Sequence, residues 1–186
     1  MDAFEELRKE HSEIMRLVSL MKHTVAHLRA NQELPEQFVQ DMLDFITGFA
    51  DKCHHGKEEK VLFPLLKSRQ LSQGDLDLID QLLEDHAQGR SFVAAMKESF
   101  KLYQNGDSGA VSELADNMES YANLLPGHIK KEAVFFKHIQ SLLTPKELAL
   151  HDEKCEKIEK ELGEHEHFLE LMDRMRATAM DLFPVN

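Results

Sequence analysis

The sequence predicts an all-α protein: an up-down-up-down four-helix bundle with an additional C-terminal fifth helix. Apolar residues recur at helical spacing through five long stretches, and no alternating strand pattern competes with them. The 186 residues include only eight Gly and five Pro, with 42% hydrophobic and 30% charged residues. This balance is typical of a soluble helical protein, and short connections between long helices favour antiparallel neighbours.

The first two helices are separated by the sequence NQELP. Residues 2–30 carry apolar side chains at helical spacing and contain no Gly or Pro, which predicts one long helix. A second helix is expected from about Pro35, a residue favoured in a first helical turn, to about Ser68. Pro64 is expected to bend its last turn.

The next two helices are expected over about 75–104 and 108–142. The sequence SQGD ends the preceding region, Asp75 is the expected cap of the third helix, and NGD at 105–107 closes it. In the fourth helix, Pro126–Gly127 is expected to cause a kink.

A capping-box pattern opens the fifth helix. Thr144 and Glu147 have the required spacing, with Pro145 at the first helical position, and the helix is expected to reach about Met180 before an irregular DLFPVN end. Residues 1–143 are thus expected to form the bundle and 144–186 a helical extension packed on it, within a single domain overall.

Charge and cysteine content restrict the partners and the compartment. The net charge of −12 would repel a phosphate backbone or an anionic membrane, so neither nucleic acid nor membrane is an expected partner. Cys53 and Cys155 form no disulfide framework, and the N-terminal residues are charged where a signal peptide is apolar. No apolar run of membrane-spanning length occurs. We expect a cytoplasmic protein.

Histidines and acids occur in an internal repeat. HHGKEEKVLF at 54–63 aligns with GHIKKEAVFF at 127–136, which superposes a His-x-x-x-Glu pair in each half. EHSEIMRLV at 10–18 aligns in the same way with DHAQGRSFV at 85–93, each with a lone histidine behind an acid. A helical hairpin with one lone histidine and one His-x-x-x-Glu pair therefore occurs twice.

Two such hairpins in one bundle would bring the repeated residues to one level of its axis, because equal chain lengths separate them from the turns. The six are His11, His55, Glu59, His86, His128 and Glu132. Buried ionisable groups in this number are expected to coordinate metal. Imidazole and carboxylate without thiolate suit iron, manganese or zinc. We predict a dinuclear centre, with iron first and manganese or zinc as alternatives, bridged by Glu59 and Glu132.

Two neighbouring features give alternatives. His54 with Glu58 is the rival pair, one residue away, but its counterpart in the repeat is Gly127, so His54 is instead expected to support the site or lie at a helix interface. His165 lies on the apolar stripe of the fifth helix and is either a core histidine, an additional ligand or a gate over the site.

Four motifs together resemble the hemerythrin-like, HHE cation-binding family: EH near the N-terminus, HHxxEExxLFP, DHxxGR and HIxKExxxF, over about residues 5–142. The resemblance implies a four-helix bundle with a non-haem di-iron site bridged by two carboxylates and an oxo or hydroxo group. It also implies O₂, peroxide or nitric oxide as ligand, and it assigns the same six residues as ligands.

Two departures from the oxygen-carrying members of that family restrict the expected function. Oxygen-carrying hemerythrins have a further histidine where this chain has Arg90, and their His-x-x-x-x-Asp is His-x-x-x-Glu at 128–132. With one histidine ligand fewer, one metal ion is expected to have an open coordination position, which favours redox chemistry or sensing over reversible oxygen carriage. We expect a di-iron protein that serves in sensing, storage or detoxification. The alternatives are a di-iron catalase or peroxidase, or an iron donor for iron–sulfur cluster repair.

Overall fold

A computed structural model describes residues 2–31, 33–163 and 165–183, and every regular element within these residues is a helix. With η marking π-helices, the elements are α1 (Ala3–Asn31), α2 (Glu36–Phe45), η1 (Ile46–His55), η2 (Glu58–Leu62), α3 (Phe63–Lys67), α4 (Gln73–Gln104), α5 (Ala110–Gln140), α6 (Pro145–Leu162) and α7 (His165–Leu182). The all-α prediction is confirmed. None of these helices is long and apolar enough to cross a membrane.

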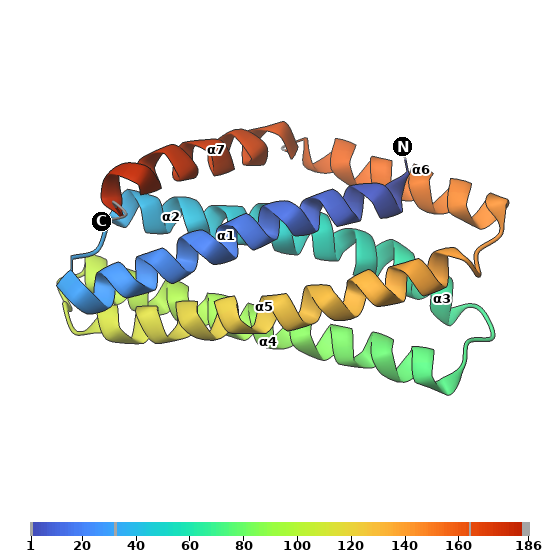
Figure 1. The fold of residues 1–186 in the computed structure, drawn as a ribbon, viewed down its shortest axis with the longest axis horizontal. Coiled ribbons are helices and arrows are strands. Elements are labelled where there is room, and N and C mark those ends of the chain that lie inside the picture. Colours follow the sequence, from blue (N-terminus) through green and yellow to red (C-terminus); the bar gives the residue numbers. More distant parts are fainter. Residues whose placement is uncertain (1, 32, 164, 184–186) are drawn as a thin grey trace.

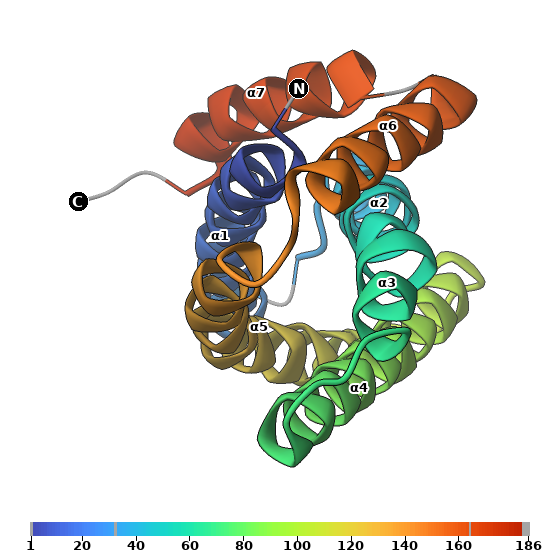
Figure 2. The same ribbon diagram turned by 90° about the vertical axis from the view of Figure 1, so that its right-hand side faces the viewer.

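Four rods form the bundle that the sequence predicts. Figure 1 shows α1, the continuous segment from α2 to α3, α4 and α5 running alongside one another in alternating directions. Seen from the end in Figure 2, these rods surround a common axis, and α6 and α7 lie across the side formed by α1 and α2. Contacts of α6 and α7 with α1, and of α7 with α2, agree with this view.

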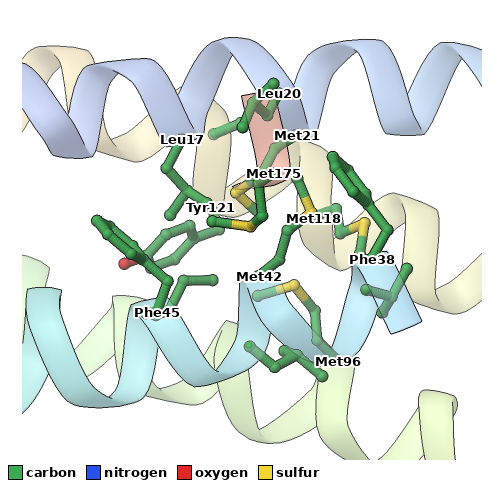
Figure 3. Packing of buried hydrophobic residues seen from close by; sticks show 14 of the residues in the cluster. Leu17, Leu20, Met21, Phe38, Met42, Phe45, Met96, Met118, Tyr121 and Met175 are labelled. Atoms are coloured by element: carbon green, nitrogen blue, oxygen red, sulfur yellow. The ribbon is translucent and has the colours of Figure 1, made fainter. Parts of the chain in front are cut away.

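Apolar cores fill the bundle on either side of a polar layer. The larger core lies toward the C-terminal end of α1 and is shown in Figure 3, with Leu17, Leu20, Met21, Phe38, Met42, Phe45, Met96, Met118, Tyr121 and Met175 labelled. A second core at the other end joins Phe4 and Leu7 to Phe135, Phe136 and Leu143. The histidine-bearing segments lie between the two, so both apolar cores exclude water from the layer they enclose.

The second rod is wound differently from the α-helix that periodicity predicts. It passes from α2 into η1 and η2, and π-helices hold more residues per turn than α-helices. Consecutive side chains can then share the inward side of the rod. His54 and His55 are accordingly both buried, with 1% and 6% of their surface exposed.

The helix ends agree with most, though not all, of the predicted signals. The capping box of Thr144 and Glu147 is present, and α5 runs through Pro126 without interruption. The prediction of Asp75 as the cap of α4 is wrong. The cap is Ser72, whose side chain accepts a hydrogen bond from the backbone N–H of Asp75.

The C-terminal extension consists of two helices, whereas periodicity predicts one. Gly163 ends α6 with a φ of 64°, a left-handed conformation that glycine adopts without steric cost, and the chain turns before α7 begins at His165. Asp181 and Leu182 continue α7 into the segment predicted to be irregular, whose last three residues, 184–186, lie outside the described part.

Close packing of α7 on η1 depends on Gly48. A Cβ atom at this position would lie 1.9 Å from the Phe168 ring, so Gly48→Ala must displace that ring. We expect a loss of about 1–3 kcal/mol in the free energy of unfolding, measured by denaturant titration. Gly127→Ala is the matched control, because nothing lies within 4 Å of its added methyl group. The control should gain up to about 1 kcal/mol from helix propensity. Equal stability of Gly48→Ala and the wild type would contradict the close packing.

Candidate metal centre

The polar layer of the bundle consists of five imidazoles and two carboxylates from all four rods. They are His11, His54, His55, Glu58, His86, His128 and Glu132, each with 6% or less of its surface exposed. These residues form two sets, and within each set one ligand atom from every residue lies within 4.8 Å of the ligand atoms of the others. Such a spacing allows several ligand atoms to reach one ion.

The two sets differ in composition. One consists of three imidazoles, from His55, His86 and His128. The other combines His11 and His54 with the carboxylates of Glu58 and Glu132. The sets meet in the middle of the layer, because Glu132 Oε1 lies 3.1 Å from His128 Nε2 while Glu132 Oε2 lies 3.0 Å from His11 Nε2. One carboxylate therefore touches both sets.

The structure brings five of the six sequence-predicted residues into this layer and differs at Glu59. The Glu59 side chain is 26% exposed and lies on the outside, where it accepts hydrogen bonds from His86 Nδ1 and from Arg90. Glu58, which is fully buried, takes the interior position expected for Glu59. His54 also faces the layer, so the rival pair of the sequence lies inside together with His55.

The difference has a physical cause in the winding of the second rod. The internal repeat aligns residues 54–63 with a stretch of α5 that is α-helical throughout. It thereby transfers an α-helical period to residues that belong largely to η1 and η2. A change of helical period rotates later side chains to another face. The layer therefore has five imidazoles although Arg90 stands where oxygen-carrying hemerythrins have a further histidine. The π-helical segment supplies two of them, His54 and His55.

Four of the five histidines are held from outside by carboxylates. In each pair the Nδ1 atom donates to the carboxylate, at 2.9 Å for His54 and Glu10, 3.3 Å for His55 and Asp51, 2.8 Å for His86 and Glu59, and 3.0 Å for His128 and Asp85. The Nε2 atoms are thereby left for the layer. Metal-ligating histidines are usually oriented in this way.

Two of these acids, Glu10 and Asp85, are part of the internal repeat of the sequence, but the repeat does not identify their partners. Glu10 and Asp85 each precede a repeated histidine, but neither binds that neighbour. Each instead accepts a hydrogen bond from the histidine on the other helix of its hairpin, His54 and His128. The acid that precedes each lone histidine in the repeat therefore orients the histidine of the His-x-x-x-Glu helix, or its neighbour, in the same hairpin.

The two inner carboxylates lack hydrogen-bond partners among the described residues. Both oxygens of Glu58 and both of Glu132 are buried, and none has hydrogen-bond geometry to a described residue. Imidazoles nevertheless face them, with His11 Nε2 3.0 Å and His128 Nε2 3.1 Å from Glu132 and His86 Nε2 3.4 Å from Glu58. A buried carboxylate without a partner is costly. The donor set fits a metal ion, which would satisfy these oxygens and the imidazole Nε2 atoms that face them.

Protonation of the layer follows from burial and from neighbouring charges. Burial and the nearby Glu132 raise the pKa of Glu58 well above its usual value. Burial acts in the same direction on Glu132, but His11, His128 and His86 outweigh it and hold the pKa of Glu132 well below its usual value. Burial lowers the pKa of His55 to about 3, so this imidazole is neutral near pH 7, as a metal ligand must be.

His86 and His128 face each other within the layer. Their Nε2 atoms lie 3.2 Å apart, and each Nδ1 already donates to a carboxylate. Burial lowers the pKa of His86, but Glu132 and Glu59 outweigh it and raise that pKa. The two Nε2 atoms are thus close enough together to bind one metal ion.

A buried lysine connects the layer to the C-terminal extension. Lys57 has no exposed surface, and its Nζ atom donates to Glu10 Oε1 at 2.5 Å and to Glu159 of α6. Burial raises the pKa of Glu10, but His54 and Lys57 outweigh it and lower that pKa to about 2. The ionised Glu10 therefore holds His54 while Lys57 compensates its charge.

Two other sequence candidates lie outside the layer. His165 of α7 packs beside Phe49, with its Nδ1 3.9 Å from Glu10 Oε1. It belongs to neither set of the layer and instead groups with Glu10 and Cys53. Cys53 is buried, and its Sγ lies 3.8 Å from Glu10 Oε1. Burial and the Glu10 charge raise the pKa of Cys53 to about 12, which keeps the thiol protonated and unreactive.

A helical bundle with a buried layer of imidazoles and carboxylates defines a class of metal-binding proteins. The family described as "Hemerythrin HHE cation binding domain" matches residues 2–139, which is most of the chain. The chain belongs to this hemerythrin-like family of metal-binding proteins, and the resemblance carried by its histidine motifs is confirmed.

Curated relatives give no further description of function. Uncharacterized protein Rv1995 of Mycobacterium tuberculosis and uncharacterized protein Mb2018 of Mycobacterium bovis are each 24% identical to this chain over 142 residues. The aligned part is 75% of this chain and 54% of each relative, so the chain spans about half of their length. No solved structure matches the chain significantly.

Replacing Lys57 should test the buried network. Lys57→Met leaves the Glu10 carboxylate buried without its cation, so we expect a loss of about 3–5 kcal/mol in the free energy of unfolding. Lys60→Met is the control, because Lys60 is exposed on the same rod. It should change stability by no more than about 0.5 kcal/mol. Denaturant titration of both variants measures the difference, and similar losses in the two would show that the Lys57 contacts contribute little.

Proposed function

We propose that the layer holds two iron ions and that the protein binds or reacts with O₂, peroxide or nitric oxide, in sensing, storage or detoxification. The observation that carries the proposal is the pair of ligand sets, joined by two buried carboxylates that lack hydrogen-bond partners in the described chain. Three imidazoles on one side, two on the other, and Glu58 and Glu132 between them suit two ions bridged by carboxylates.

Charge supports a pair of cations. With the inner carboxylates ionised, the layer and its immediate surroundings contain six carboxylates, from Glu10, Asp51, Glu58, Glu59, Asp85 and Glu132. Within the described part of the chain, three lysine or arginine side chains contact them, from Lys57, Arg90 and Lys131. Iron and other borderline metals accept imidazole and carboxylate together, whereas thiolate-preferring sites need cysteine. The only cysteine near the layer, Cys53, faces Glu10.

The surroundings of the layer restrict the ligand to a small molecule. Apolar cores close both ends, and the imidazoles are almost fully buried. Iron, when bound, would supply exchangeable coordination and electron transfer. The chain's own residues orient the imidazoles through the outer carboxylates, exclude bulk water and hold a proton at Glu58 that can leave when a cation arrives.

Elemental analysis with optical spectroscopy tests this function. We expect two iron ions per chain and ligand-to-metal absorption bands that change on addition of azide or peroxide. Steady catalytic loss of peroxide would favour a catalase or peroxidase over a binding protein. Failure of the folded chain to bind iron after reconstitution would refute the centre.

Replacement of the two neighbouring glutamates separates the structural assignment from the sequence-based one. Glu58→Ala removes a proposed bridging carboxylate and should abolish binding of at least one ion. Glu59→Ala removes the group that orients His86 and should retain both ions with affinity lower by about 10–100-fold. Metal content and competition with a chelator measure both effects. The opposite order would restore Glu59 as the inner ligand.

Metal loading should release protons near pH 7. Glu58 holds a proton in the metal-free chain because burial and Glu132 raise its pKa, and a coordinating carboxylate must lose that proton. We expect release of at least about one proton per chain on loading with Fe²⁺, measured calorimetrically in buffers of different ionisation enthalpy. Glu58→Gln should release fewer protons, and an unchanged release would contradict the proposed protonation.

A further inference from the structure

A pocket of about 300 Å³ lies beside the polar layer, between the second rod and α4. His55 and its partner Asp51 line one side, Arg90 and Lys97 of α4 line another, and Tyr121 of α5 contributes as well. This volume is at the lower end of the range for small-molecule sites in proteins. The pocket is therefore large enough for a ligand bigger than a diatomic molecule.

Tyr121 lines the pocket with a side chain that is almost fully buried. Only 2% of its surface is exposed, and its hydroxyl makes no hydrogen bond within the described residues. In Figure 3 the hydroxyl points toward the side of Phe45, away from Phe38 and Met96. Burial raises the pKa of Tyr121, so the hydroxyl stays protonated and can donate. The hydroxyl is therefore available as a neutral hydrogen-bond donor to a ligand in the pocket.

The two cations that line the pocket have donors to spare. Arg90 uses its Nε atom on Asp51 and its Nη2 atom on Glu59, and its Nη1 atom has no partner in the described chain. Lys97 is exposed and makes no ion pair with any described residue. Asp51 is the one carboxylate lining the pocket, and Arg90 already neutralises it. The lining residues thus carry one net positive charge, that of Lys97, because Arg90 is paired with Asp51 and with Glu59 beside the pocket.

Apolar groups complete the walls. Ile46 and Val93 line the pocket on opposite sides, together with the ring of Tyr121. The absence of a side chain at Gly89 leaves space beside that ring, since a Cβ atom there would lie 3.4 Å from it. Ordinary hydrophobic contact is therefore available to the body of a ligand whose head meets the donors.

We propose that this pocket binds a small organic carboxylate, with its head at Arg90, Lys97 and Tyr121 and its apolar body against Ile46 and Val93. Binding at this site is separate from the proposed iron centre. It is also suited to influence that centre, because Arg90 holds the two carboxylates that orient His55 and His86. A ligand that draws Arg90 toward itself changes the support of both imidazoles.

Methyl NMR on the full chain tests the proposal with benzoate as the probe and benzamide as its neutral match. We expect the methyl signals of Ile46 and Val93 to shift and saturate with benzoate, in the metal-free and the metal-loaded chain alike. Benzamide should bind at least about tenfold more weakly, because it offers no charge to the two cations.

Single replacements locate the binding groups. Lys97→Gln should weaken benzoate binding about threefold to tenfold, and Tyr121→Phe by a similar factor through loss of one hydrogen bond. Lys101→Gln is the matched control, one turn further along the exposed side of α4, and should bind benzoate as the wild type does.

The outcomes separate this proposal from the proposed function. Benzoate that leaves the Ile46 and Val93 signals unchanged overturns the carboxylate site, whatever the iron content. Equal binding of benzamide overturns it too, as does unchanged affinity in both Lys97→Gln and Tyr121→Phe. If benzoate binds as expected but the chain takes up no iron, the carboxylate site stands and the metal proposal fails.

Discussion

Burial of Glu58 and Glu132 in the middle of the bundle is the constraint on which the surrounding structure depends. Charges in a water-excluded layer are tolerated only when other groups compensate them. Histidines from all four rods surround the two carboxylates, and outer carboxylates orient four of those histidines. The outer carboxylates in turn need compensating charge, which Lys57, Arg90 and Lys131 supply.

Charge compensation also explains why the C-terminal helices belong with the bundle. Glu159 of α6 approaches Lys57 from outside, and Lys57 in turn contacts Glu10, the partner of His54. The matched family region ends at residue 139, before α6 begins. An element outside that region therefore contributes to the support of an inner histidine.

Helical periodicity was sufficient to predict the bundle, because long amphipathic stretches without Gly or Pro leave few alternatives. The internal repeat was sufficient for residues on α-helical rods, such as His86 and Glu132. It failed at Glu58, since a π-helical turn changes which residues share a face and leaves no mark in the repeat. The contact between Lys57 and Glu159 could not be predicted either, because it joins residues 102 positions apart through tertiary packing alone.

The π-helical segment also breaks the symmetry of the molecule. Two identical hairpins would give a layer with equivalent halves, related by a twofold axis along the bundle. The hairpin of α4 and α5 contributes two imidazoles and one carboxylate, whereas the first hairpin contributes three imidazoles and one carboxylate. The two ligand sets differ as well, because one has three imidazoles and the other two imidazoles with two carboxylates, so two ions held by them would be chemically unequal. An incoming ligand would then have one preferred ion, and the two would differ in reduction potential.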